Sequence, residues 1–248
     1  MSFDHHLPPP PPALLRRASL FLDFDGTLVE IADQPDAVVV DAALRDLLSE
    51  LARRLEGRLA LVSGRSIAQL DALLGPIAET LTLSGSHGSE YRIDGAEERP
   101  TRPDSLDLIE ARLREAAAAE TGVIVEPKSL GVALHYRQQP DYAGEAHALV
   151  TALARENGLA VQHGKMMVEA RLPGSDKGAA VARLMQHPAM DGTLPVFMGD
   201  DITDETGFEA ARARGGAGIL VGPPRATAAA YRLADPAATR RWLAGGCP

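Results

Sequence analysis

Four polar residues in this chain lie at or just after the ends of short apolar runs, and they are Asp23, Asp25, Ser63 and Asp200. Such runs are typical of buried strands in a parallel sheet. Because ligands bind beyond the carboxyl ends of parallel strands, we expect the four side chains at one rim. Several carboxylates at one rim repel each other unless a cation compensates them. Oxygen ligands without a nearby His or Cys favour a hard ion, and Mg²⁺ fits best.

A lysine in the segment 174–178 supplies a second positive charge. Lys177 lies at the start of an expected helix, where the helix dipole also favours anions. With a metal and this lysine in place, Asp23 could attack phosphorus and form an aspartyl-phosphate. Asp25 could protonate the leaving oxygen and later deprotonate water. The hydroxyl of Ser63 would bind the phosphoryl oxygens.

Each of these features also has an ordinary structural explanation. Acidic residues are common at strand ends and helix caps, Ser63-Gly64 alone is a turn, and Lys177 alone is a surface lysine. Their joint occurrence, in this order and each at a strand end or a helix start, favours a catalytic site.

The elements that would position these residues alternate between strands and helices. Apolar runs predict strands at 19–22, 59–62, 81–83, 196–198 and 219–221. Amphipathic stretches between them predict helices, for example at 41–55 and after Ser63, where Ser66 and Gln69 form a capping-box pair. This alternation predicts an α/β fold with a doubly wound, mainly parallel sheet.

The middle of the chain has a different pattern, helix–strand–strand–helix–strand–strand, over about 101–172. We interpret it as a smaller α/β cap domain inserted between two halves of a core, 16–100 and 173–248. The first 15 residues contain His5-His6 and five consecutive prolines, and this composition predicts a disordered tail.

The composition limits the classes of partner. A formal net charge of −9 argues against nucleic acid and anionic membranes. Cys247 is the only cysteine, so neither an intrachain disulfide nor a Cys-rich zinc site can form. No apolar signal core and no run of 18 apolar residues occurs, so we expect a cytoplasmic protein with a small-molecule substrate and no obligate protein partner.

Four segments resemble the four motifs of the haloacid dehalogenase superfamily of phosphatases, and they are residues 23–28, 63–65, Lys177 and 199–205. The resemblance implies a Rossmann-like core with Asp23 as nucleophile and Asp25 as acid and base. It also implies Mg²⁺ binding by Asp23, by the backbone carbonyl of Asp25, and by Asp200. Asp201 and Asp204 would then support these ligands from outside, and Gly64 and Arg65 would contact the substrate.

Further segments are similar to the family of trehalose-6-phosphate phosphatases, and they are residues 85–90, 126–128, 134–137 and 164–169. In that family a mobile cap binds the sugar. The resemblance therefore implies substrate contacts from five residues, which are Glu126, Lys128, Arg137, Lys165 and Glu169. Carboxylates accept hydrogen bonds from sugar hydroxyls, and Lys or Arg can reach hydroxyls or phosphate. Considered singly, each could instead be a solvated surface charge.

The function that this resemblance implies is Mg²⁺-dependent hydrolysis of trehalose 6-phosphate, the last step of trehalose biosynthesis. One alternative is another sugar-phosphate phosphatase of the same superfamily, for example one acting on sucrose 6-phosphate. A second is a sensor that binds a sugar phosphate without hydrolysing it. The presence of both Asp23 and Asp25 speaks against the sensor, because a pure binder needs neither a nucleophile nor its acid–base partner.

Overall fold

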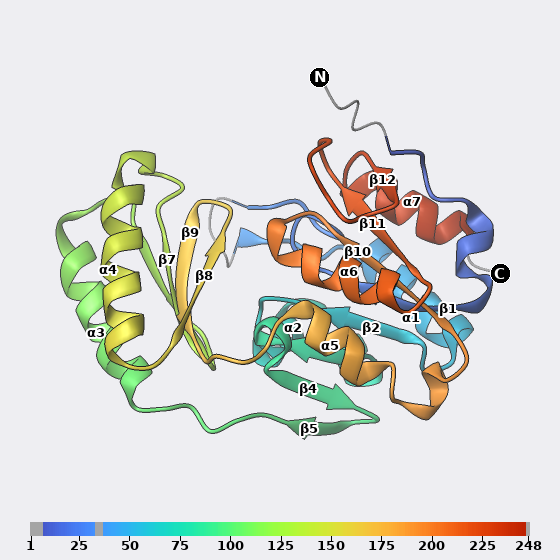
Figure 1. The fold of residues 1–248 in the computed structure, drawn as a ribbon, viewed down its shortest axis with the longest axis horizontal. Helices are drawn as coiled ribbons and strands as arrows, with labels where there is room; N and C mark the ends of the chain where they lie inside the picture. Colours follow the sequence, from blue (N-terminus) through green and yellow to red (C-terminus); the bar gives the residue numbers. More distant parts are fainter. Residues whose placement is uncertain (1–6, 33–36, 247–248) are drawn as a thin grey trace. The chain divides into compact units, whose positions relative to one another are not determined.

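The structure is a computed structural model that describes residues 7–32 and 37–246. Contacts divide the described residues into two compact units. The core unit is built from the described parts of Met1–Ile31, Val38–Glu98 and Asp176–Pro248, and the cap unit is built mainly from Arg99–Ser175. Each unit has its own sheet (Figure 1).

The cap unit is slightly longer than the predicted insert, 101–172, by two residues at its start and three at its end. Both ends of the insert are tied to the same turn of the cap sheet. The guanidinium of Arg102 donates to the carbonyl of Ser129 at 3.2 Å, and the N–H of Leu172 donates to the carbonyl of Leu130 at 3.1 Å. These contacts hold the ends of the insert within the cap unit.

The core sheet has eight strands in the order β12-β11-β10-β1-β2-β3-β4-β5. The strands are β1 (Ala18–Leu22), β2 (Leu59–Val62), β3 (Thr82–Gly85), β4 (Glu90–Ile93), β5 (Ala96–Glu98), β10 (Leu194–Gly199), β11 (Ala217–Val221) and β12 (Tyr231–Leu233). The strands from β12 to β3 pair in parallel, while β4 and β5 add antiparallel pairs at one edge. The order of the strands reverses at β1, which confirms the predicted doubly wound α/β fold.

The described helices of the core unit cover both faces of this sheet (Figure 1). They are α1 (Ala42–Leu55), α2 (Ile67–Leu74), α5 (Lys177–Leu184), α6 (Glu205–Ala213) and α7 (Pro236–Gly246). Helices α5 and α6 pack on one face, and α1 and α7 pack together on the other. Throughout the described ranges, no helix combines the length and the apolar character needed to cross a membrane.

Two helices begin where their cap residues predict. The carboxylate of Asp41 accepts a hydrogen bond from the N–H of Leu44 at 2.7 Å and starts α1. Ser66 and Gln69 form the predicted capping box at the start of α2. The capping box starts α2 five residues after the end of β2 at Val62.

The prediction that residues 1–15 form a disordered tail is wrong for its described part, 7–15. The carbonyl of Pro8 accepts a hydrogen bond from the N–H of Arg232 at 3.0 Å, and the carbonyl of Pro10 accepts one from the indole of Trp242 at 2.9 Å. Leu15 is fully buried in the short 3-10 helix Pro12–Arg17. Prolines keep their carbonyl acceptors, so a proline-rich segment can still be held by donors from β12 and α7. Residues 1–6 lie outside the described ranges.

The cap unit is a four-stranded antiparallel sheet in the order β6-β7-β9-β8. Its elements are α3 (Ser105–Ala116), β6 (Ile124–Pro127), β7 (Gly131–His135), α4 (Ala143–Glu156), β8 (Ala160–Gly164) and β9 (Met167–Arg171). Helices α3 and α4 pack on one face of the sheet and form a separate apolar core with it (Figure 1). The opposite face is left for polar side chains.

Candidate active site

Asp23 follows β1 in the middle of the core sheet. Because Leu22 pairs with Met198 of β10, Asp23 lies beside the loop that carries Asp200. The N–H of Asp23 donates to the carbonyl of Met198 at 2.9 Å, and the hydroxyl of Thr27 donates to its Oδ2 at 3.2 Å. The carboxylate predicted to be the nucleophile is therefore buried and held in one orientation.

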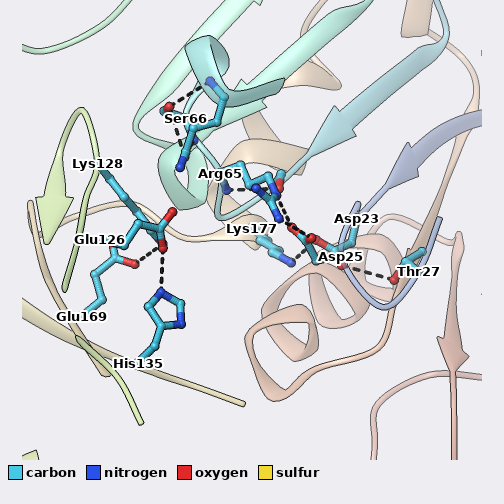
Figure 2. A network of polar contacts seen from close by, with 12 residues as sticks. Asp23, Asp25, Thr27, Arg65, Ser66, Glu126, Lys128, His135, Glu169 and Lys177 are labelled. Atoms are coloured by element: carbon cyan, nitrogen blue, oxygen red, sulfur yellow. Dashed lines mark hydrogen bonds and ion pairs between the residues drawn. The ribbon is translucent and has the colours of Figure 1, made fainter. Parts of the chain in front are cut away.

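Lys177 is the first residue of α5, a helix whose N-terminus is capped by the carboxylate of Asp176. Its Nζ donates to Oδ1 of Asp23 and to Oδ1 of Asp204, each at 2.6 Å, and Figure 2 shows the lysine pointing at Asp23. The whole residue is only 3 % exposed. Lys177 is therefore a buried cation and not a surface lysine.

The charges in this cluster shift one another's pKa values. Burial raises the pKa of Asp23 well above its usual value; Lys177 opposes this rise, and Asp204 and Asp200 add to it. Burial alone would lower the pKa of Lys177, but Asp204 and Asp23 outweigh that effect and raise it. The lysine is therefore charged, while an ionised Asp23 calls for more positive charge than one lysine provides.

Three buried carboxylates converge on one point of the core unit, and they belong to Asp23, Asp200 and Asp204. One oxygen from each lies within 4.8 Å of the other two. The donors are all carboxylate oxygens, which is the donor chemistry that Mg²⁺ prefers. Because the cluster contains three carboxylates and one lysine, a bound divalent cation would also offset its excess negative charge. The residues present therefore fit the predicted metal.

Two acidic residues of the 200–204 loop were expected to support the metal ligands from outside. Asp204 lies closer than that, because one of its oxygens belongs to the convergent group. Oδ2 of Asp204 accepts a hydrogen bond from the N–H of Asp201 at 2.9 Å. The carboxylate of Asp201 accepts a hydrogen bond from the N–H of Ile202 at 2.6 Å, so its contact lies within the backbone of the loop.

Gly26 allows the loop after β1 to approach Asp200. Its φ is +79°, and a Cβ at this position would lie 2.3 Å from Oδ2 of Asp200. Any larger residue would have to push away a carboxylate of the cluster. The glycine between Asp25 and Thr27 is therefore required by the site itself.

Asp25, the predicted acid and base, is held by Arg65 (Figure 2). The guanidinium donates from Nε to Oδ2 at 2.7 Å and from Nη2 to Oδ1 at 2.8 Å, which is a bidentate pair. About a third of the Asp25 side chain is exposed, at 33 %. Arg65 was predicted to contact the substrate, and the structure shows its guanidinium bound to the carboxylate of Asp25. Its contact with the substrate stays a prediction.

Ser63 follows β2, and the strained turn at Ser86 and His87 contacts its backbone. The hydroxyl of Ser63 accepts a hydrogen bond from the N–H of Arg65 at 3.1 Å, and its carbonyl accepts one from the N–H of His87 at 3.0 Å. Ser86 and His87 have φ values of +47° and +54°, which are costly for residues with a Cβ. A Cβ on Gly64 would lie 2.6 Å from the His87 ring, so this loop also requires glycine.

The cap unit carries its own cluster of polar side chains on β6, β7 and β9 and on Lys128, which follows β6. Nζ of Lys128 donates to Oε2 of Glu169 at 2.6 Å, and both side chains are buried, at 8 % and 2 % exposed. Nε2 of His135 lies 2.7 Å from Oε2 of Glu126. Figure 2 labels all four residues. The predicted sugar-binding residues Glu126, Lys128 and Glu169 are therefore arranged in pairs.

The two remaining cap predictions lie at the tip of the β8–β9 hairpin and beside it. Nη2 of Arg137 donates to the backbone carbonyl of Lys165 at 3.0 Å. This contact is exposed to solvent. Binding of substrate by these two residues stays a prediction.

Two contributors to the polar clusters were missed in the sequence. Thr27 donates to Asp23, and its position four residues after that aspartate in the first motif was an available signal. His135 was left out of the predicted site, although it pairs with Glu126. Alternation along a strand puts residues of neighbouring strands on one face, but without the register the partner of His135 could not be identified.

Comparison with known proteins gives a consistent result. A family model described as Trehalose-phosphatase matches residues 21–237. The trehalose-6-phosphate phosphatase of Escherichia coli (strain K12) is 40% identical over 229 residues, which cover 90% of this chain and 84% of that protein.

Solved structures agree on the fold. A trehalose-6-phosphate phosphatase related protein superimposes with a TM-score of 0.76 at 29% identity, covering 91% of this chain and 95% of that one. The C-terminal domain of the Candida albicans trehalose-6-phosphate phosphatase gives a TM-score of 0.82 at 23% identity, covering 98% and 99%. At that identity the second comparison bears on the fold alone.

Proposed function

The chain belongs to the trehalose-phosphatase family, and from this premise we propose that it hydrolyses trehalose 6-phosphate to trehalose and phosphate with Mg²⁺, through an aspartyl-phosphate on Asp23. The observation that supports this mechanism best is the buried group of Asp23, Asp204 and Lys177, with Asp200 beside it. A fixed carboxylate, a fixed cation and a set of oxygen donors for Mg²⁺ meet there.

The first half of the reaction needs an ionised nucleophile and a proton donor. An oxygen of Asp23 attacks phosphorus, and the bond from phosphorus to the sugar oxygen breaks. Asp25 gives its proton to that sugar oxygen, so trehalose leaves as an alcohol. Bound Mg²⁺, held by Asp23 and Asp200, would neutralise phosphoryl charge and favour the anionic form of Asp23.

The second half returns the site to its starting state. Asp25, now ionised, takes a proton from water, and the resulting hydroxide attacks the phosphorus of the aspartyl-phosphate. The bond from phosphorus to Asp23 breaks, which releases phosphate. Lys177 keeps its contact with Asp23 throughout and limits the charge that builds up. Arg65 holds both oxygens of Asp25, so one oxygen must be freed before the proton moves.

The cap cluster supports the choice of a sugar as the leaving group. Glu126, Glu169 and Lys128 offer carboxylate acceptors and an ammonium donor, which suit sugar hydroxyls. We propose that these residues bind the glucose units of the substrate.

Phosphate release from a panel of esters tests the proposal. The wild-type protein with Mg²⁺ should prefer trehalose 6-phosphate over sucrose 6-phosphate and glucose 6-phosphate in kcat/KM. Equal or better hydrolysis of sucrose 6-phosphate would shift the assignment to a different sugar-phosphate phosphatase. No release from any ester with Mg²⁺ present would leave a sugar-phosphate sensor.

A further inference from the structure

The loop between β11 and β12 contacts residues 200–204 through a hydrogen bond from Arg225 to the carbonyl of Asp201. We propose that Arg225, on this loop, and Glu205, at the start of α6, form a clamp that holds residues 200–204 in the shape that binds Mg²⁺. Both would be positioning residues for the metal. The inference rests on the Mg²⁺-dependent function proposed above.

Glu205 is the anchor of the clamp. Its Oε2 accepts a hydrogen bond from the N–H of Ala228 at 2.7 Å, and its Oε1 accepts one from the hydroxyl of Thr227 at 2.8 Å. Oε1 also pairs with Nη1 of Arg225. Both oxygens of Glu205 are therefore occupied by one short stretch of the β11–β12 loop, which fixes that loop to the start of α6.

Arg225 connects Glu205 to residues 200–204. Its Nη2 donates to the carbonyl of Asp201 at 2.7 Å, and the same carbonyl accepts the N–H of Asp204 at 3.1 Å. The N–H of Asp201 donates in turn to the carboxylate of Asp204 at 2.9 Å. Both polar backbone groups of Asp201 are thus held, and Asp201 is bonded directly to Asp200.

The negative charge of the site explains why restraining residues 200–204 would strengthen Mg²⁺ binding. Asp23, Asp200 and Asp204 bring carboxylate oxygens within 4.8 Å of one another, and Lys177 is the cation in contact with two of them. Without Mg²⁺, mutual repulsion favours a loop that moves Asp200 outward. A loop that has relaxed in this way must be ordered again when Mg²⁺ binds, and that cost lowers affinity.

A purely structural tie between two loops is the competing explanation. The Arg225–Glu205 pair is partly exposed, at 28% and 21% for the two side chains, and exposed pairs contribute little to overall stability. The two explanations therefore differ in their consequence. A structural tie predicts a small loss of stability and unchanged Mg²⁺ affinity, whereas a clamp predicts weaker Mg²⁺ binding.

Calorimetric titration of the full-length protein with MgCl₂ separates these outcomes. Arg225→Ala and Glu205→Gln should each raise the Kd for Mg²⁺ roughly tenfold, in the range found for residues that support metal ligands. The Mg²⁺-dependent rise in unfolding temperature should shift to higher Mg²⁺ concentration, and kcat at saturating Mg²⁺ should stay close to the wild-type value. Arg214→Ala is the matched control, because Arg214 follows the other end of α6 and contacts only a backbone carbonyl there.

Wild-type affinity for Mg²⁺ in the Arg225→Ala protein would overturn the clamp and leave the proposed function intact. Absence of Mg²⁺ binding by the wild-type protein would overturn both. Should Arg225→Ala fail to fold, Thr227→Val removes the hydrogen bond from the Thr227 hydroxyl to Glu205 and the one that this hydroxyl accepts from the N–H of Ala229. It leaves Arg225 in place and should weaken Mg²⁺ binding by a smaller factor. An unchanged Kd in that variant would equally count against the clamp.

Discussion

Each unit of the molecule contains a cluster of buried charges around one lysine, and the two clusters differ in their balance of charge. In the core unit, Lys177 contacts two carboxylates, and a third lies beside them. In the cap unit, Lys128 contacts the carboxylate of Glu169. The core cluster has an excess of negative charge that a cation can relieve. Among the described residues, the group of three convergent carboxylates that could hold a metal lies in the core unit and not in the cap unit.

The clusters also differ in what holds them. The core carboxylates lie on loops that glycines, caps and backbone hydrogen bonds fix from several sides. The cap side chains project from antiparallel strands and satisfy one another. A ligand entering the cap cluster must therefore replace hydrogen bonds that already exist, which makes binding selective for a partner with well-placed hydroxyls.

Asp23→Asn should give the largest effect on activity. Removing the nucleophile should lower kcat by about 10⁴-fold or more, as for other residues that act as a catalytic unit. The same change should raise the unfolding temperature in EDTA, because it removes one of three repelling carboxylates whose burial is costly. Phosphate release and thermal unfolding measure the two effects. A less stable but active variant would contradict the proposed charge imbalance and the assigned nucleophile.

Lys177→Met should give the largest effect on stability. Without the lysine, Asp23 and Asp204 remain buried with no cation in contact, a change that costs about 3–5 kcal/mol in the free energy of unfolding. Urea unfolding in EDTA measures the loss. Lys128→Met is the matched change in the cap, and it should cost less, because in the core a third carboxylate, Asp200, lies beside the two that lose contact with Lys177. Equal losses in the two variants would remove the contrast between the clusters.

Glu169→Gln should change recognition and leave the chemical step intact. Losing a charge-assisted hydrogen bond costs about 1.5–3 kcal/mol, so kcat/KM for trehalose 6-phosphate should fall by about 10- to 100-fold, mainly through KM. Hydrolysis of p-nitrophenyl phosphate, which has no sugar, provides the control and should stay near the wild-type rate. A parallel fall for both esters would show that Glu169 supports the cap fold and not the sugar.

The smallest expected effect is a pH dependence of the cap unit. Burial lowers the pKa of His147, and the stacked ring of His163, 4.9 Å away, lowers it further. The unfolded chain therefore binds this proton more readily than the folded one, so stability is complete above the ordinary histidine pKa of about 6.5 and falls as the pH drops below it. His147→Gln should reduce the loss of stability between about pH 7 and pH 5. Urea midpoints at several pH values measure it, and an unchanged slope would contradict this reading.

The sequence was sufficient for those parts of the fold that depend on local pattern. The strands near Asp23 and Ser63 and the capping box at Ser66 are confirmed, because apolar runs and cap residues act over a few positions. The hairpin of β4 and β5 was missed, although Asp94-Gly95, with φ values of +50° and +78°, is a typical two-residue turn. Its strand β5 is exposed along its length and lacks an apolar run.

The sequence placed Asp23, Asp200 and Lys177 at one rim of the sheet, and the structure brings the three together. It did not predict which side chains pair with one another. That Arg65 would hold Asp25, across 40 residues, depends on the packing of two loops. The same holds for the contact of Arg225 with Asp201, across 24 residues. Contacts of this kind follow from register and loop geometry, which a single sequence does not encode in any local pattern.

The proline-rich segment that packs beside β12 has a consequence for the sheet as a whole. β12 is the last strand on its side, and the carbonyl of Pro8 meets its N–H at Arg232. The following residues, 9–12, are all prolines and have no N–H to offer a further strand. They act as a stop that prevents a second copy from extending the sheet at this edge. Removing residues 1–15 would take away these prolines and leave the edge of β12 open to pairing with a second copy of the chain.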